Sequence, residues 1–146
     1  MATDVKQDYL TINKKNYALS DLSELAKKFA QDLFRTVAEY NELYKSYKNN
    51  STLINSHAAN LKEEVLKVKL PIAEQESNTN IVIENIRYEG TNLPESVQEF
   101  VKDLLKANAD KVNIEFRLRQ LDAARLLFTS VLEKEITTST PPEYKV

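Results

Sequence analysis

Residues 10–24, LTINKKNYALSDLSE, have a counterpart in residues 81–95, IVIENIRYEGTNLPE. The two align without a gap at an offset of 71 positions (81 − 10). The alignment extends to residues 33 and 104, and seven of its 24 pairs are identical. The identical pairs are Ile12/Ile83, Tyr17/Tyr88, Leu22/Leu93, Glu24/Glu95, Phe29/Phe100, Asp32/Asp103 and Leu33/Leu104. We therefore predict that one structural unit occurs twice in the chain.

The first part of each copy has the pattern of a β-hairpin. Leu10 and Ile12 alternate with polar residues, the polar run 13–16 follows, and Tyr17 resumes the alternation. The second copy repeats this with residues 81–88. A period of two, interrupted by a short polar turn, is typical of two antiparallel strands.

The second part of each copy has the pattern of a helix start. Asp21 and Asn92 are side chains that commonly cap a helix, and Glu24 and Glu95 follow three positions later. This spacing is that of a capping box. Pro94 suits a first helical turn, where no backbone N–H is required. We therefore predict N-caps at Asp21 and Asn92.

Beyond these caps, apolar residues recur every three or four positions, from Leu22 to Val68 and from Leu93 to Ile136. Each run is either one helix of about 68 Å, at 1.5 Å per residue, or a helix–turn–helix. We favour a helical hairpin in the first copy, because Asn49-Asn50-Ser51-Thr52 interrupts the apolar pattern. The predicted fold class is α+β and mainly α: two tandem repeats of a β-hairpin with helices, forming a helical bundle with a small antiparallel sheet.

Proline positions and polar runs divide the chain further. Pro71 ends the first helical run, and Pro141 and Pro142 end the second. The predicted organisation is an N-terminal arm (1–8), repeat 1 (9–69), a linker (70–80), repeat 2 (81–137) and an extended C-terminal arm (138–146).

The composition excludes several classes of function. The 146 residues include no Cys, one His and one Gly, and carry a formal charge of −2. We therefore expect no metal site, no cofactor, no phosphate-binding glycine loop, no small-molecule substrate and no enzyme activity. The near-neutral charge disfavours nucleic acid. Without a signal peptide or an apolar run of membrane-spanning length, we expect a location in the cytoplasm or in a virion, with no membrane contact.

The candidate interaction residues are aromatic. Tyr40, Tyr44 and Tyr47 lie at i, i+4 and i+7, which places them on one side of a helix. They indicate a protein interface or a packed core, since tyrosine buries a large ring while its hydroxyl reaches water. Phe34 and Phe116 widen the apolar stripes, as expected of helices that bury two faces, either within a bundle or against a further chain. The predicted protein interface comprises Tyr40, Tyr44, Tyr47, Phe34, Phe116 and Tyr144.

Two other features have simpler interpretations. His57 stands alone, so we expect a residue of the helix surface or an interface, and no ligand or catalyst. The three arginines in residues 117–125 form a weak basic patch that we expect to pair with Glu115 and Asp122.

The residues 10–23 resemble a family of small uncharacterised proteins of cyanobacteria and their phages, which open with a Thr-Ile hairpin, a tyrosine and a Leu-Ser helix start before a heptad-rich helix. Residues 81–104 resemble it less closely. The family usually has glycine in its turn, where this chain has Lys14 and Asn85. Since lysine adopts positive φ poorly, we expect the first turn to differ in type from the second. The resemblance implies a helical assembly module and no activity.

We therefore expect a structural protein that acts through protein–protein contacts, as a homo-oligomer or with other virion proteins. Its most concrete form is a phage capsid, neck or tail accessory protein. The alternative is a small helical adaptor that binds a host protein.

Overall fold

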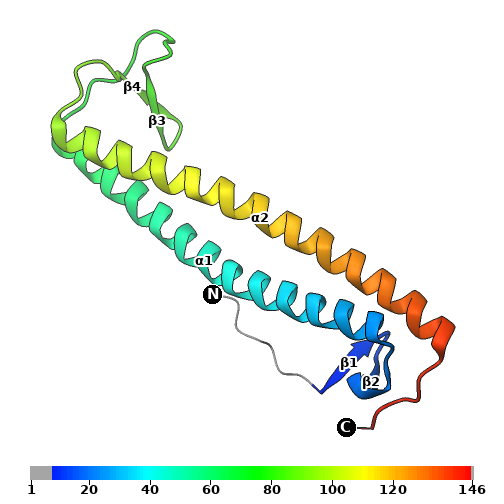
Figure 1. Ribbon diagram of the computed structural model, residues 1–146. Helices are drawn as coiled ribbons and strands as arrows, with labels where there is room; N and C mark the ends of the chain where they lie inside the picture. Colours follow the sequence, from blue (N-terminus) through cyan, green and yellow to red (C-terminus); the bar gives the residue numbers. More distant parts are fainter. Residues whose placement is uncertain (1–7, 146) are drawn as a thin grey trace. The chain divides into compact units, whose positions relative to one another are not determined.

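The computed structural model describes residues 8–145 (Figure 1). The elements in chain order are β1 (Tyr9–Ile12), β2 (Lys15–Ala18), a single 3₁₀ turn η1 (Leu19–Asp21), α1 (Glu24–Lys67), β3 (Ile81–Ile83), β4 (Ile86–Tyr88) and α2 (Glu95–Ser139). This confirms the mainly helical α+β class. The described chain forms two compact units, unit 1 from residues 8–45 and 115–145 and unit 2 from residues 46–114. Each unit therefore combines parts of both sequence repeats, because α1 and α2 each run through both units.

The two hairpins have the same geometry. β1 pairs with β2 and β3 with β4, both antiparallel, and Leu10↔Tyr17 corresponds in register to Ile81↔Tyr88. The turn residues Asn13 and Lys14 have φ of 52° and 65°, and Glu84 and Asn85 have φ of 50° and 66°. Two successive residues of positive φ make the two-residue turn whose twist matches that of the strands. The expected difference between the two turns is therefore wrong, and Lys14 adopts the left-handed conformation.

The helix starts lie two residues beyond the predicted caps. The first helical bonds of α1 and α2 are accepted by the carbonyls of Ser23 and Pro94, from Lys27 N at 2.9 Å and Gln98 N at 3.0 Å. The Ser23 hydroxyl accepts the N–H of Ala26 at 3.1 Å, as an N-cap does. Asp21 instead belongs to the 3₁₀ turn η1.

In the second copy, Asn92 has a φ of 59°, which is a left-handed loop conformation. The predicted caps at Asp21 and Asn92 are therefore wrong, because the chain uses these residues to turn from hairpin to helix.

Both helices are continuous, and the helical hairpin favoured for the first copy is wrong. α1 passes through residues 49–52 without a break. Asn50 is buried there, and its amide Nδ2 donates to the carbonyl oxygen of Ala107 on α2 at 3.0 Å. A polar residue in the apolar seam is therefore satisfied by the neighbouring helix, so the pattern is interrupted while the helix is not.

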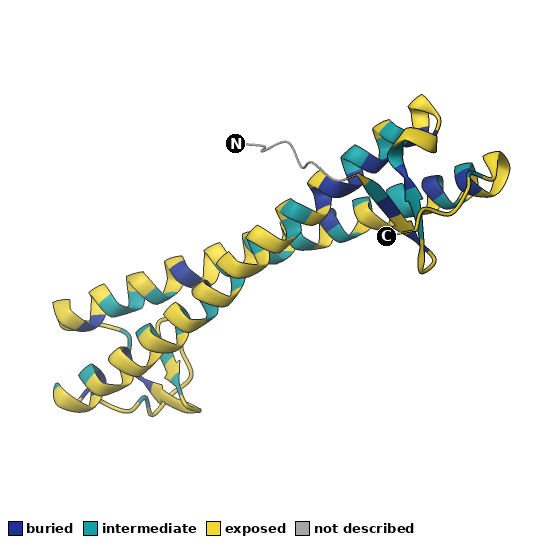
Figure 2. Ribbon diagram, turned by 90° about the horizontal axis from the view of Figure 1, so that it is seen from below, coloured by how far each residue is buried: buried dark blue, intermediate teal, exposed yellow. Residues whose placement is uncertain are grey.

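Each unit has its own hydrophobic core, built in the same way. In unit 1, the hairpin residues Leu10 and Ile12 pack with the start of α1 and with Leu132 and Ile136 near the end of α2. In unit 2, Tyr88 of the hairpin packs with the start of α2 and with the end of α1. Within each unit the two helical segments run antiparallel, and the buried residues gather beside the hairpin (Figure 2). A hairpin alone is marginal in water, so the helices supply the apolar surface that holds it.

The core shows that the repeat extends well beyond residue 33. Leu61 and Val65 in unit 2 stand 71 positions before Leu132 and Ile136 in unit 1, and all four are buried. Left-handed residues follow both helices at this spacing, with Lys69 at φ 55° and Thr140 at φ 43°.

The segments after both helices add to a hairpin edge. Ala73 N donates to the carbonyl of Arg87 at 2.9 Å. At the repeat-equivalent positions, 71 later for the donor and 71 earlier for the acceptor, Tyr144 N donates to the carbonyl of Asn16 at 2.7 Å. Ile72 also forms a bridge with Tyr88. The predicted linker 70–80 and the predicted C-terminal arm are therefore equivalent pieces, each docked on the outer edge of a hairpin.

This docking changes the interpretation of the predicted C-terminal arm. α2 continues to Ser139, and the segment after it returns to the hairpin of its own chain. The ring of Tyr144 also contacts that of Tyr9, with centroids 5.9 Å apart. Residues 1–7 of the predicted N-terminal arm lie outside the described residues.

Candidate protein interface

The predicted tyrosine row lies along α1, half-buried to exposed. In unit 1, the rings of Tyr40 and Tyr44 stack with centroids 6.2 Å apart and an angle of 8° between their planes. Tyr44 is 42% exposed, and Tyr47, in unit 2, is half-buried. These rings therefore present an aromatic surface while remaining in contact with their own helix.

The other predicted interface residues divide into three cases. Phe34 is buried in the core of unit 1, so its assignment to a protein interface is wrong. It widens the stripe of α1 because that helix packs against the hairpin as well as against α2. Tyr144 packs against Tyr9 within the chain. Phe116 is 57% exposed and remains accessible to a partner.

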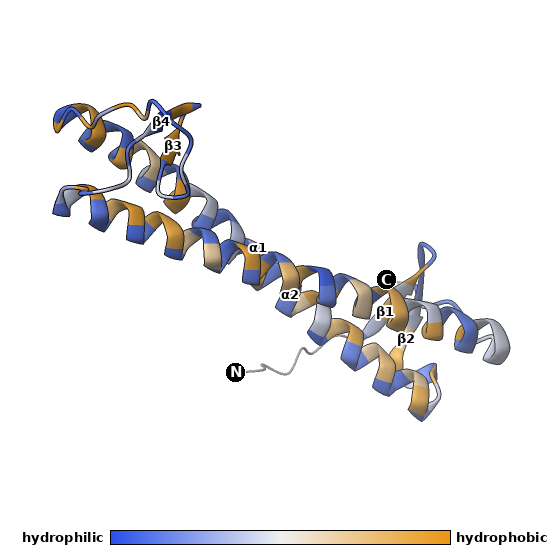
Figure 3. Ribbon diagram, turned by 90° about the horizontal axis from the view of Figure 1, so that it is seen from above, coloured by the Kyte–Doolittle hydropathy of each residue, from blue (hydrophilic) through white to orange (hydrophobic). Residues whose placement is uncertain are grey.

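Phe116 belongs to a second apolar face of α2, of which the sequence interpretation named only this residue as an interface residue. In unit 1, Leu127 also lies on the side of the helix away from the core residue Leu132, with Leu126 at its margin. In unit 2, Leu105 and Val112 lie on the side of the helix away from the buried Ala107. Their exposed fractions range from 57% for Phe116 to 64% for Leu105. Apolar positions accordingly occur on opposite sides of α2. Hydrophobic residues recur along the whole helix (Figure 3).

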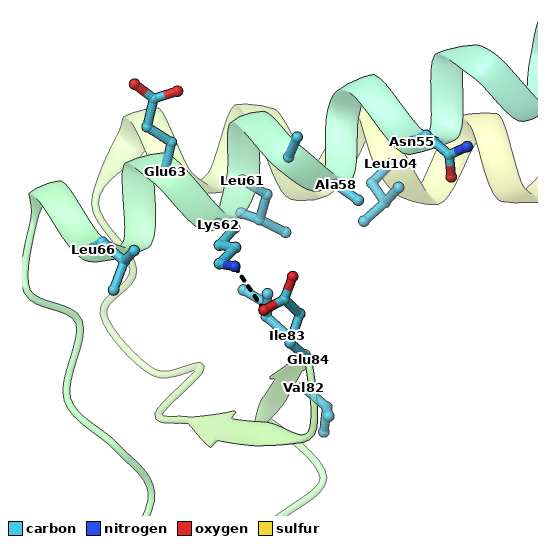
Figure 4. A pocket seen from close by; sticks show the side chains of 11 residues that line it. Asn55, Ala58, Leu61, Lys62, Glu63, Leu66, Val82, Ile83, Glu84 and Leu104 are labelled. Atoms are coloured by element: carbon cyan, nitrogen blue, oxygen red, sulfur yellow. Dashed lines mark ion pairs between the residues drawn. The ribbon is translucent and has the colours of Figure 1, made fainter.

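Unit 2 also contains a groove between α1 and the hairpin, with a volume of about 590 Å³. Its α1 wall includes Ala58, Ala59 and Leu66, and consecutive residues Val82 and Ile83 border it on the other side (Figure 4). Because neighbouring residues of β3 both line the groove, the strand turns its edge toward it. Small side chains on the α1 wall leave the space open.

The edge of β3 carries backbone groups that the hairpin does not use. The two-residue turn makes Ile83↔Ile86 a hydrogen-bonded pair, so Val82↔Arg87 is a non-hydrogen-bonded pair. Both members therefore direct N–H and C=O away from the hairpin. On the β4 side, the Arg87 carbonyl accepts Ala73 N. Among residues 8–145, no strand pairs with β3 on the Val82 side.

Charged residues frame these surfaces with exposed ion pairs. Lys62 Nζ lies 2.7 Å from Glu84 Oε2 and joins α1 to the hairpin turn across the groove. In unit 1, Arg117 pairs with Glu39 at 2.7 Å, and Arg125 pairs with Asp122 at 2.9 Å. The predicted pairing of the arginine region with Asp122 is therefore confirmed for Arg125, whereas Arg117 reaches across to α1.

The described residues also bear on the expectations for a metal site, for His57 and for a membrane span. Among residues 8–145, no three His, Asp or Glu side chains gather in a way that would hold a metal ion. His57 is half-buried on α1. In the same residues, neither helix has an apolar stretch that would cross a bilayer. Comparison of the chain with protein-family models, with curated proteins and with solved structures found no match.

The sequence interpretation missed Ala58, Ala59, Leu66 and Val82 because none is unusual by itself. One signal was present for the second face of α2. Leu105, Val112 and Phe116 recur at steps of seven and four, which is a second helical period beside that of the core.

Proposed function

We propose that this protein is a non-enzymatic structural protein that assembles through protein–protein contacts, as a homo-oligomer or with other proteins of a particle. The observation that carries the proposal is the second apolar face of α2. Large apolar side chains such as Leu105 and Phe116 are more than half exposed on a helix whose opposite side already packs in the core. Clusters of exposed apolar residues on soluble proteins commonly mark interaction sites.

The most concrete form of this proposal is a phage virion component, such as a capsid, neck or tail accessory protein. It rests on the resemblance of residues 10–23 to small proteins of cyanobacteria and their phages.

Self-association is tested by gel filtration with light scattering at micromolar concentration. We expect a mass that is a multiple of 16.8 kDa. Phe116→Glu places a charge on the second face of α2 and should shift the mass to that of the monomer, since burying an unpaired charge is costly. Ser96→Glu adds the same charge at an exposed polar position of α2 on the opposite side of the helix from Phe116 and should leave the mass unchanged.

The virion assignment is tested by mass spectrometry of purified particles from the source organism or its virus. Recovery of the chain in stoichiometric amounts supports it. A strict monomer that does not co-purify with particles contradicts the assembly role. A pull-down that recovers one stoichiometric soluble partner would instead favour an adaptor.

A further inference from the structure

We propose that the groove of unit 2 binds an extended segment of a partner protein, which adds as a strand to the open edge of β3 and places apolar side chains against Ala58, Ala59 and Leu66. This inference deepens the proposed assembly function by naming the form of one partner, and it rests on that function. It concerns a different surface from the second face of α2.

The shape of the occupant follows from the backbone groups of β3. The N–H and C=O of Val82 point away from β4 on the side that borders the groove. A segment in extended conformation satisfies both groups, whereas a helix has no free backbone groups along its sides. The occupant is therefore an extended strand.

The chain already contains strand addition on the opposite side of the same hairpin. Ala73 N donates to the carbonyl of Arg87, Pro71 accepts Glu89 N at 2.9 Å, and Ile72 forms a bridge with Tyr88. Residues 71–73 thus extend the hairpin at β4 with an extended, largely apolar segment. The corresponding place beside β3 has the same unused backbone groups and no strand from the described residues.

The internal repeat indicates that the fold does not require the apolar wall of this groove. The positions in unit 1 equivalent to Ala58, Ala59 and Leu66 carry Thr129, Ser130 and Thr137. Unit 1 forms the same hairpin and helix arrangement with hydroxyl-bearing residues there. At one lining position the order is reversed: unit 2 has the polar Asn55 where unit 1 has the apolar Leu126. The apolar groove is therefore a particular property of unit 2.

The dimensions and charge of the groove define the partner segment further. Its volume of about 590 Å³ suits the side chains of a short segment and lies within the usual range for binding clefts. Leu66 and Val82 are each 62% exposed at its borders and offer apolar contacts. Glu84 binds Lys62 through Oε2 while its side chain stays 64% exposed, so its carboxylate can accept a second cation. The segment therefore has apolar residues at alternate positions and a lysine or arginine beside them.

The proposal is tested by selecting random heptapeptides displayed on phage against the full-length protein, with counter-selection against an Ala59→Arg variant. Ala59 is exposed, so the arginine should fill the groove without disturbing the helix. The matched control is Ser130→Arg, which makes the same change at the repeat-equivalent, exposed position. Affinities of recovered synthetic peptides are measured by fluorescence anisotropy, and circular dichroism verifies that each variant is folded.

We expect recovered peptides with alternating apolar residues and a basic residue. Their affinity should fall at least about tenfold in Ala59→Arg and change less than about twofold in Ser130→Arg. Changes in amide chemical shifts should be centred on Val82 and the α1 wall of the groove. A second variant, Val82→Pro, removes the N–H and should weaken binding, with Thr11→Pro as its repeat-equivalent control.

Three results would overturn the proposal. One is the absence of any peptide that distinguishes the native protein from Ala59→Arg, and another is recovered peptides that bind as helices. The third is self-association that Ala59→Arg abolishes, which would assign the groove to a second copy of the chain. None of these readouts depends on particle association or on Phe116, so the proposed assembly role can fail or stand independently.

Discussion

Replacing Asn50 by leucine should stabilise the protein, although it removes a buried hydrogen bond. Asn50 is 9% exposed on α1, and its amide donates to the carbonyl of Ala107 at 3.0 Å. That carbonyl lies within continuous helix α2 and keeps its helical partner when the asparagine is absent. Leu121 occupies the position in the second repeat that is equivalent to Asn50. It is buried, with an exposed fraction of 4%.

Three contributions set the expected size of the change. Loss of the hydrogen bond costs about 1 kcal/mol. Burial of a leucine side chain contributes about 2 kcal/mol. The higher helix propensity of leucine adds about 0.5 kcal/mol. Steric crowding offsets part of the gain, although the open groove of about 540 Å³ that Asn50 borders leaves room for the larger side chain. The free energy of unfolding should therefore rise by about 1 kcal/mol.

The assay is urea unfolding followed by circular dichroism at the helical band, with the midpoint and slope compared between variants. Asn49→Leu is the matched control, because Asn49 is exposed on the same turn and should gain only about 0.5 kcal/mol from propensity. If Asn50→Leu instead lowers the free energy of unfolding by more than about 1 kcal/mol, the hydrogen bond to Ala107 contributes more than a typical one and the reasoning is refuted. An unchanged midpoint with a lower slope would indicate that the variant unfolds with less change in exposed surface or no longer unfolds in two states.

Two further changes test local features of the fold. Gly90→Ala should destabilise the protein by about 3 kcal/mol, because a Cβ atom there would lie 1.4 Å from the carbonyl oxygen of Thr79; a thermal melt that is unchanged would show that the loop moves aside freely. Ser23→Ala should lower the free energy of unfolding, measured in urea, by about 1 kcal/mol, because it removes an N-cap. Asp21→Ala should lower it by less than half of that. Equal losses would show that Asp21 caps the helix after all.

Local chemistry made the hairpins and the existence of the helices predictable. The alternation around residues 13–16 and its copy around Asn85 specified two hairpins, since the side chains of a strand alternate between its faces. The helix caps were misplaced because Asp21 and Asn92 were judged by residue type and by the spacing to Glu24 and Glu95. Their backbone conformations, a 3₁₀ turn and a φ of 59°, depend on how the hairpin packs on the following helix.

The candidate interface was predicted less well for a related reason. A helical period identifies apolar faces, but it does not say which face meets another part of the same chain. Phe34 and Phe116 both widen an apolar stripe in the sequence. In the structure Phe34 is buried in unit 1, whereas Phe116 is 57% exposed. The groove beside β3 was not predictable, because it combines ordinary residues of α1 with a strand edge far away in the sequence.

By itself, the sequence determined that one hairpin-and-helix unit occurs twice, because strand alternation, turn residues and helical periodicity act over a few neighbouring residues. The packing of the folded chain, by contrast, determined that each core combines the start of one repeat with the end of the other. It also decided that α1 stays whole at Asn50 and that the segments after both helices dock on hairpin edges. These outcomes depend on contacts between residues far apart in the chain, where burial and hydrogen bonding across elements outweigh local preference.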